Sequence, residues 1–121
     1  KNINIQIYGA EPMEADDAYR SLLSGKIQSN ETTNTICDGL RAQLGTITFP
    51  IIREKVNGII PISEEDIIST MQMIWERMKI IVEPSCSIVL AAVLNNKKIF
   101  SGKKVGLILS GGNVDLDQLP W

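Results

Sequence analysis

A serine, two glycines and an asparagine follow an apolar stretch near the end of the chain, in the order Ser110-Gly111-Gly112-Asn113. The apolar residues of 104–109 do not alternate with polar ones, which is typical of a strand covered by helices on both faces. Ligands of parallel sheets bind at the carboxyl ends of strands, so these side chains predict a binding site. Glycines let the backbone approach a flat or anionic ligand, although a strand followed by two glycines also occurs in ordinary turns.

Acidic side chains are concentrated in residues 11–17, where four of seven residues are Asp or Glu. One interpretation is the start of a helix that ends at Gly25, because acids in a first turn interact favourably with the helix dipole. The other is a site for a hard cation such as Mg²⁺ or Ca²⁺, which prefers carboxylate and carbonyl oxygens. The residue types alone leave both interpretations open.

Two strands are predicted from the pattern of apolar residues. Ile3, Ile5 and Ile7 alternate with polar residues and predict a strand that ends at Tyr8-Gly9, just before the acids. A short strand is predicted at 59–62, where an internal proline favours the edge of a sheet.

Three helices are predicted after the first one. A short helix starts at Thr48 with a proline in its first turn. Ser63, followed by acids, predicts the cap of a long helix with one apolar stripe. Pro84 ends that helix, and Ser85 is predicted to cap the next. The buried strand expected at 104–109 is typical of an α/β fold with a mostly parallel sheet flanked by helices.

Composition narrows the class of protein. With 121 residues, 44% of them hydrophobic, the chain has the size of one ordinary domain or part of one. A net charge of −2, with acids and bases mixed along the chain, favours neither a nucleic-acid nor a membrane-surface partner. No apolar run approaches the roughly 20 residues that span a bilayer. We expect a soluble, cytoplasmic protein.

Histidine is absent, and the only cysteines are Cys37 and Cys86. Their spacing is not that of a C-x-x-C motif and no histidine completes a zinc site, so reduced structural thiols are expected. Ser-His-Asp and Cys-His catalysis are excluded within this chain. Acid–base chemistry therefore needs carboxylates, a lysine or a cofactor.

The run from Ser110 to Asp115 resembles the C-terminal signature of the fold-type II pyridoxal-phosphate enzymes, and most closely the serine racemase and threonine dehydratase group. In that group the serine hydroxyl bonds the pyridine nitrogen of pyridoxal 5'-phosphate (PLP), which implies this role for Ser110, with Gly111 beside it. The segment around Gly39 is similar to an Ala-Asp-Gly segment whose main chain approaches the cofactor, with a turn as the alternative. Glu83 also corresponds to a position near the cofactor, where its local role is to bind or to orient neighbours.

The acidic segment is similar to the divalent-cation motif of the serine racemases. The resemblance implies that the carboxylates of Glu11 and Asp17 and the carbonyl of Ala15 bind Mg²⁺, Ca²⁺ or Mn²⁺. Related enzymes use an asparagine for a second cation, but Ile47 stands at the corresponding position. A second site is therefore not implied.

Residues 75–79 are also similar to the serine racemases. In the animal enzymes the arginine and lysine of this segment help to bind ATP, an allosteric activator, near the interface of a homodimer. The resemblance implies the same role for Arg77 and Lys79, together with Asn113. The alternative is a solvated basic patch at a helix end, where cations suit the helix dipole.

The resemblance identifies residues 1–121 as the C-terminal part of the large PLP-binding domain. The Schiff-base lysine, the substrate-carboxylate loop and the phosphate loop are expected in the missing N-terminal part of the same enzyme, so the chain alone should be inactive. Starting at Lys1 without methionine is consistent with this expectation.

The implied activity is that of a serine racemase, which interconverts L- and D-serine and also eliminates water to give pyruvate and ammonia. A threonine/serine or 3-hydroxyaspartate dehydratase is the enzymatic alternative. A non-catalytic nucleotide- or metal-binding half-domain is an alternative of another class.

Overall fold

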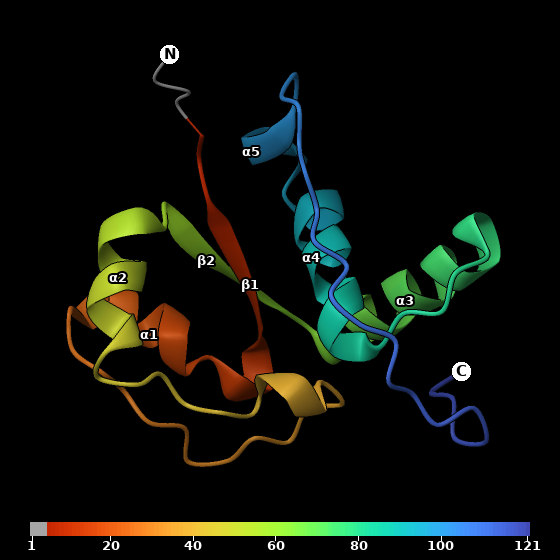
Figure 1. Cartoon of the computed structure of the whole chain (residues 1–121), viewed down its shortest axis with the longest axis horizontal. Helices are drawn as coiled ribbons and strands as arrows, with labels where there is room; N and C mark the ends of the chain where they lie inside the picture. The colour runs from red at the N-terminus through yellow and green to blue at the C-terminus, as the bar shows by residue number, and fades with distance from the viewer. Residues whose placement is uncertain (1–4) are drawn as a thin grey trace.

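The computed structural model describes residues 5–121 and contains a parallel sheet with helices on both faces (Figure 1). Within these residues the sheet has two strands, β1 (Tyr8–Pro12) and β2 (Gly58–Ile62), with Tyr8 opposite Gly58 and Pro12 opposite Ile62. The predicted α/β class with a parallel sheet is confirmed.

Five α-helices and two short 3₁₀ helices connect and cover the described strands. The α-helices are α1 (Asp17–Ser24), α2 (Thr48–Lys55), α3 (Glu64–Met78), α4 (Pro84–Asn95) and α5 (Lys97–Phe100), and the 3₁₀ helices are η1 (Met13–Ala15) and η2 (Asp38–Leu40). Ala10 and Ile60 pack toward α4, whereas Glu11 points to α1. Helices α1 and α4 thus cover opposite faces of the sheet (Figure 1).

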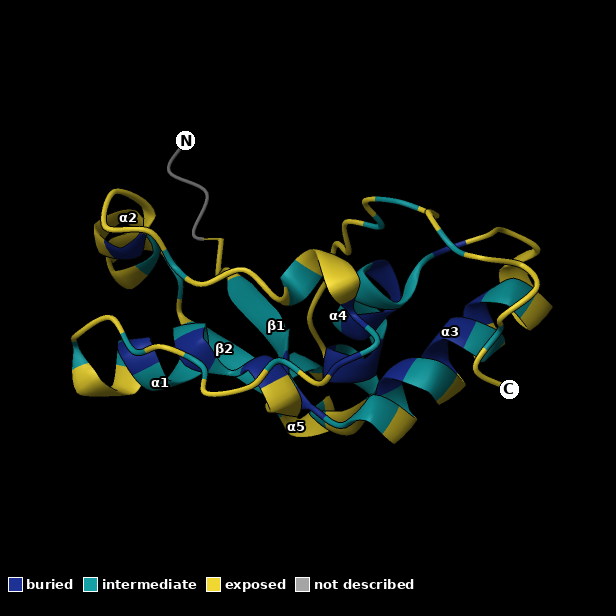
Figure 2. Cartoon of the chain, turned by 90° about the horizontal axis from the view of Figure 1, so that it is seen from below, coloured by how far each residue is buried: buried dark blue, intermediate teal, exposed yellow. Residues whose placement is uncertain are grey.

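The buried residues form two hydrophobic clusters on either side of α4. The sheet-side cluster contains Cys37, Ile62, Ile67, Ile88, Ala91 and Ala92. The α3-side cluster contains Met71, Ile74, Val82 and Cys86, with Trp75, Leu90, Leu109 and Val114 packed against it. Figure 2 shows one face of α3 buried and the opposite face exposed, whereas α4 is buried or half-buried almost throughout. Both cysteines are buried and free, as predicted.

Local sequence signals placed most helix ends correctly, but α3 ends at Met78, with Lys79 as its C-cap, and not at Pro84 as predicted. Ser63 caps α3 by accepting a hydrogen bond from the Asp66 N–H at 3.2 Å, and Gly25 ends α1 with a left-handed φ of 70°. One cap was wrong: Glu83, not Ser85, is the N-cap of α4. Pro84 takes the first helical position, where its missing N–H is not needed.

The first strand lies later than predicted. Of the alternating residues, Ile3 lies outside the described residues, and β1 begins at Tyr8, where the sequence predicted the end. Ile7 is bonded to Asn57 instead: its carbonyl accepts the Asn57 N–H at 2.7 Å, and its N–H donates to Asn57 Oδ1 at 2.8 Å. Pairing with β2, a non-local contact, therefore sets where β1 begins.

The strand predicted at 104–109 is not formed. This segment runs past α4 without strand pairing within the described residues (Figure 1), and Ile108 is 82% exposed. A strand needs a neighbour to bond its N–H and C=O groups. An apolar cavity separates the segment from the edge of β1 that does not pair with β2, so no strand among residues 5–121 is in reach of it.

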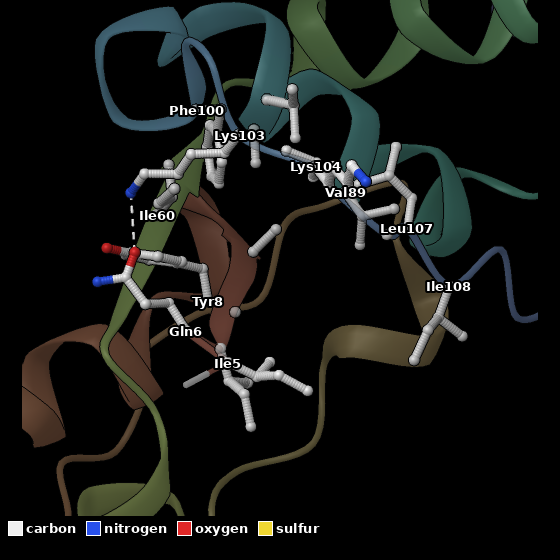
Figure 3. Close-up of a pocket in the computed structure, with 17 residues that line it drawn as sticks. Ile5, Gln6, Tyr8, Ile60, Val89, Phe100, Lys103, Lys104, Leu107 and Ile108 are labelled. Atoms are coloured by element: carbon white, nitrogen blue, oxygen red, sulfur yellow. Dashed lines mark hydrogen bonds between the residues drawn. The ribbon is translucent and has the colours of Figure 1, made fainter. Parts of the chain in front are cut away.

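This cavity has a volume of about 920 Å³ (Figure 3). The side chains of Ile5, Val89 and Leu107 contribute to its largely apolar lining. Lys103 donates a hydrogen bond to Gln6 Oε1 at 2.8 Å on one side of it.

No helix among residues 5–121 is long and apolar enough to cross a membrane.

Candidate functional site

The residues predicted to bind the cofactor meet at the N-terminus of α4. The Glu83 N–H donates to the Gly111 carbonyl at 3.2 Å, and the Asn113 N–H donates to Glu83 Oε2 at 2.9 Å. From the other side, the Gly39 N–H donates to Ser85 Oγ at 3.1 Å. The segment around Gly39 and the loop 110–113, more than sixty positions apart in the sequence, are therefore both hydrogen-bonded to the start of α4.

A side chain at any of three glycines at this place would crowd a neighbouring atom. A Cβ on Gly111 would lie 2.8 Å from Glu83 Oε1, and one on Gly112 would lie 2.8 Å from the Ile81 carbonyl oxygen. A Cβ on Gly39 would lie 3.1 Å from Ser85 Oγ. Gly112 thus lies close to the backbone of Ile81, and Gly39 and Gly111 lie close to the side chains of Ser85 and Glu83.

The loop 110–113 is anchored at both ends. Leu109, immediately before it, and Val114, immediately after it, pack against the α3-side cluster. The loop residues between them are exposed or half-buried. The hydrophobic anchors hold Ser110 at the surface of the core rather than inside it.

The Ser110 side chain is exposed and makes no hydrogen bond to any described residue. A hydroxyl can donate one hydrogen bond and accept two, so its donor is free for a ligand. A free donor beside two tightly packed glycines fits the edge of a flat heteroaromatic ring. The residues present therefore fit the pyridine nitrogen of PLP.

Glu11, a predicted cation ligand, lies at the end of β1 beside the start of α1. Its carboxylate accepts hydrogen bonds from the N–H groups of Ala18 at 3.1 Å and Tyr19 at 2.9 Å. Burial raises the pKa of Glu11 from its ordinary value of 4.5 to about 7, against the effect of these two hydrogen bonds, and the charges of Asp17 and Asp16 raise it further. The Glu11 carboxylate therefore accepts hydrogen bonds from two N–H groups in the first turn of α1, which agrees with the helix-start interpretation.

Asp17, the other predicted carboxylate ligand, is 1% exposed. Its Oδ1 accepts a hydrogen bond from Asn30 Nδ2 at 2.7 Å, and its Oδ2 accepts one from the Leu44 N–H at 3.0 Å. Ala15, whose carbonyl is the third predicted ligand, is also buried. Each carboxylate oxygen of Asp17 already has a protein partner.

The cation site stays a prediction. No three acidic, cysteine or histidine side chains of residues 5–121 are grouped as a metal-binding cluster, and the predicted set has only two carboxylates and a carbonyl. Ile47, at the position of the second cation in related enzymes, is 82% exposed and precedes α2.

The residues predicted to bind ATP lie at the C-terminal end of α3 and in the loop 110–113. Lys79 is the C-cap of α3 in the left-handed conformation, with a φ of 58°. Arg77 and Lys79 are exposed, and neither side chain forms an ion pair or hydrogen bond within the described part of the chain. Trp75 packs edge to face with Trp121 at 5.3 Å, so the chain end lies beside this turn of α3. Among the hydrogen bonds of residues 5–121, none joins Arg77 or Lys79 to Asn113.

Sequence reasoning missed the residues that hold these groups in place. Ser85 fixes Gly39, and Asn30 with Leu44 satisfies Asp17. These partners are separated by 46, 13 and 27 positions, so no spacing pattern could indicate them. Burial also raises the pKa of Cys37 to about 12, which makes it an unreactive core thiol rather than a nucleophile.

Comparison of the chain with known proteins shows its family. The family described as "Pyridoxal-phosphate dependent enzyme" matches residues 1–111. The chain belongs to the pyridoxal-phosphate dependent enzymes. Its structural relatives have the fold-type II architecture that the sequence motifs predict.

Among individual relatives, a serine racemase from Dictyostelium discoideum is 52% identical over 98% of this chain and 38% of its own length. A beta-hydroxyaspartate dehydratase from Paracoccus denitrificans is 42% identical over 96% of this chain and 37% of its own length. The crystal structure of the Dictyostelium discoideum serine racemase superposes with a TM-score of 0.87 at 54% identity, covering 95% of this chain and 37% of that one. The chain thus spans little more than a third of these relatives.

Proposed function

We propose that the complete polypeptide is a PLP-dependent serine racemase that also eliminates water from serine to give pyruvate and ammonia. The observation that carries the proposal is the convergence of Gly39, Glu83 and the Ser110–Asn113 loop at the start of α4, in a chain of this family. The name of the Dictyostelium relative supports the choice of L-serine and D-serine as substrates.

When bound, the cofactor supplies the electron sink for removal of the substrate's α-proton. In this proposal the Ser110 hydroxyl donates a hydrogen bond to the ring nitrogen, with Gly39 and Gly111 beside it. A neutral hydroxyl does not hold that nitrogen protonated as a carboxylate does, which weakens the sink. A weaker sink favours prompt reprotonation or elimination over transamination.

The test is Ser110→Ala in the complete enzyme with L-serine. We expect racemisation and elimination to fall together, by tenfold or more, because the hydrogen bond to the ring that serves as the electron sink is lost. Ser101→Ala is the matched control, since Ser101 is exposed and its hydroxyl makes no hydrogen bond within the described chain. Turnover of Ser110→Ala equal to that of the wild type would refute the assignment.

The enzymatic alternative is a threonine/serine or 3-hydroxyaspartate dehydratase, which the name of the Paracoccus relative supports. Measuring the elimination of L-threonine and L-threo-3-hydroxyaspartate beside D-serine formation separates the two. A non-catalytic half-domain, the alternative of another class, predicts turnover of none of these substrates.

We further propose that Glu11, Asp17 and the Ala15 carbonyl bind Mg²⁺, Ca²⁺ or Mn²⁺ in the complete enzyme. Their oxygen chemistry supports the proposal, although Asp17 must then bind the cation beside its present partners or in place of them. Mg²⁺ should raise the melting temperature, and Asp17→Asn should abolish the increment. Glu14→Gln, a neighbouring exposed acid, is the control. An unchanged increment in Asp17→Asn leaves the acids with only the helix-start role.

ATP is proposed as an allosteric activator that binds Arg77, Lys79 and Asn113 near a homodimer interface. The two exposed cations without partners in the described chain support it. Lys79→Ala should weaken ATP activation about tenfold, whereas Lys98→Ala, on α5, should not. An unchanged ATP response in Lys79→Ala removes this lysine from the site.

The remaining partner is the N-terminal part of the same polypeptide, which we propose contributes a strand to the 920 Å³ cavity. Three observations support this placement: one edge of β1 is unpaired among the described residues, residues 104–109 form no strand pairing with them, and the chain covers 38% of its relative. A strand between the two would cover Ile5, Leu107 and the other apolar side chains that line the cavity (Figure 3).

Hydrogen exchange tests this placement. Amides of 105–109 should be strongly protected in the complete protein and unprotected in the 121-residue chain. Equal exchange in both would contradict it, and dimerisation of the 121-residue chain with protection of these amides would assign the cavity to a second copy.

A cytoplasmic location is proposed from the two buried free thiols, because cysteines remain reduced there. Fractionation of the cell with immunodetection of the complete protein tests it.

A further inference from the structure

Glu83 differs from an ordinary helix cap. It is the N-cap of α4, yet its side chain makes no capping hydrogen bond to the first turn of the helix. The carboxylate instead accepts the N–H of Asn113, 30 positions along the chain, at 2.9 Å. We propose that Glu83 is a positioning residue, which holds the Ser110–Asn113 loop in the shape that presents the Ser110 hydroxyl. This inference rests on the proposed cofactor role of Ser110.

Glu83 forms hydrogen bonds with both neighbours of Gly112, namely Gly111 and Asn113. The Glu83 N–H donates to the Gly111 carbonyl at 3.2 Å, and Oε2 accepts from Asn113. These are the hydrogen bonds that residues 110–113 make to other described residues. The interior of an exposed loop is thus fixed by one amino acid, through its main chain and its side chain.

The carboxylate also lies directly on the loop backbone. A Cβ added to Gly111 would be 2.8 Å from Glu83 Oε1 and 3.2 Å from Glu83 Cδ. A methyl group there would push the carboxylate away and so break its bond to Asn113. The Glu83 carboxylate and the glycine at 111 therefore depend on each other. Gly111 does not have a positive φ, so the contact with Glu83, and not the backbone conformation, favours glycine here.

The position of Ser110 follows from this unit. Leu109 is held by the α3-side cluster and Gly111 by Glu83, so the residue between them has both neighbours fixed. Losing the carboxylate frees the Gly112–Asn113 half of the loop, while the hydrophobic anchors and the bond from the Glu83 N–H to the Gly111 carbonyl remain. Ser110 would then keep its place near the site but lose its orientation.

The experiment uses the complete protein with Glu83→Ala and Glu83→Gln. The glutamine retains an acceptor oxygen of the same reach, whereas alanine has none. With the cofactor removed, hydrogen exchange of the Asn113 amide should be about tenfold faster in Glu83→Ala and near the wild-type rate in Glu83→Gln. PLP affinity should fall about tenfold in Glu83→Ala and recover in Glu83→Gln.

Gly111→Ala supplies a second, independent variant. It should accelerate Asn113 exchange as Glu83→Ala does, and the double variant should add little, because both changes remove the same bond. Gly45→Ala and Glu54→Ala are the controls: a Cβ on Gly45 would make an ordinary contact of 3.5 Å with Thr48 Oγ1, and Glu54 is exposed and pairs with Lys55. Neither should change the exchange of Asn113.

Unchanged Asn113 exchange in Glu83→Ala would overturn the inference. So would a Glu83→Gln variant that keeps Asn113 protected but loses PLP as Glu83→Ala does, because the charge would then act on the cofactor directly. Failure of the wild-type protein to bind PLP would refute the proposed function instead, while the exchange comparison in cofactor-free protein would still decide the role of Glu83.

Discussion

The acidic segment at the start of α1 and the loop after residue 109 differ in how their polar groups are satisfied. Glu11 and Asp17 accept hydrogen bonds from partners in the same half of the chain. The Ser110 hydroxyl has no partner among the described residues, although the backbone around it is firmly held. Two sites implied by the same resemblance are thus unlike: the first stabilises the fold without any ligand, and the second keeps a donor free.

The largest expected effect concerns Asp17. Asp17→Ala leaves the Asn30 amide and the Leu44 N–H without partners in a buried place, so the free energy of unfolding should fall by about 3 kcal/mol. Urea denaturation measures the change. A loss under about 1 kcal/mol would mean that these groups find other partners, and the contrast between the two regions would disappear.

A smaller effect is expected for the hydrophobic anchor of the loop. Leu109 is half-buried against the α3-side cluster. Leu109→Ala should cost about 1.5 kcal/mol, less than a fully buried leucine. The same denaturation series measures it, with the exposed Leu116→Ala as control. Equal, negligible losses for both would show that the loop is not anchored.

The pH dependence of stability tests the burial of Glu11. Its pKa is about 7 in the folded chain against an ordinary 4.5, so the folded state holds the proton more tightly. The contribution of Glu11 to stability is therefore greatest below pH 4.5 and declines as the pH rises to about 7. Glu11→Gln cannot ionise and should remove about 1 kcal/mol of this decline, a value reduced by solvent screening of a half-buried group.

Unfolding measured across this pH range in both proteins gives the two slopes. Identical slopes for wild type and Glu11→Gln would contradict the raised pKa.

The smallest effect on stability belongs to Ser110. Ser110→Ala should change the free energy of unfolding by less than about 0.5 kcal/mol, because an exposed hydroxyl without a partner in the described chain is removed. Together with the expected loss of turnover, this would separate a ligand-binding residue from a structural one. A loss comparable with that of Asp17→Ala would mean that the hydroxyl supports the loop itself.

The helices were predictable because their signals are local. Ser63, Gly25 and Pro84 mark helix ends through bonds and steric limits within a few residues. The start of β1 and the state of 104–109 were not, because a strand depends on a neighbour distant in sequence. The motifs predicted the side chains of both sites. The partners of Asp17 and Gly39 could be identified only from the structure, because they are distant in sequence.

The free edge of β1 has a consequence for the behaviour of the chain in solution. Unpaired strand groups beside exposed apolar residues such as Ile5 and Ile7 form a template for edge-to-edge aggregation. Lys103 and Lys104 line the same cavity and act as charged gatekeepers against a second hydrophobic edge. In the 121-residue chain, the charges of these two lysines should therefore oppose the pairing of two such edges.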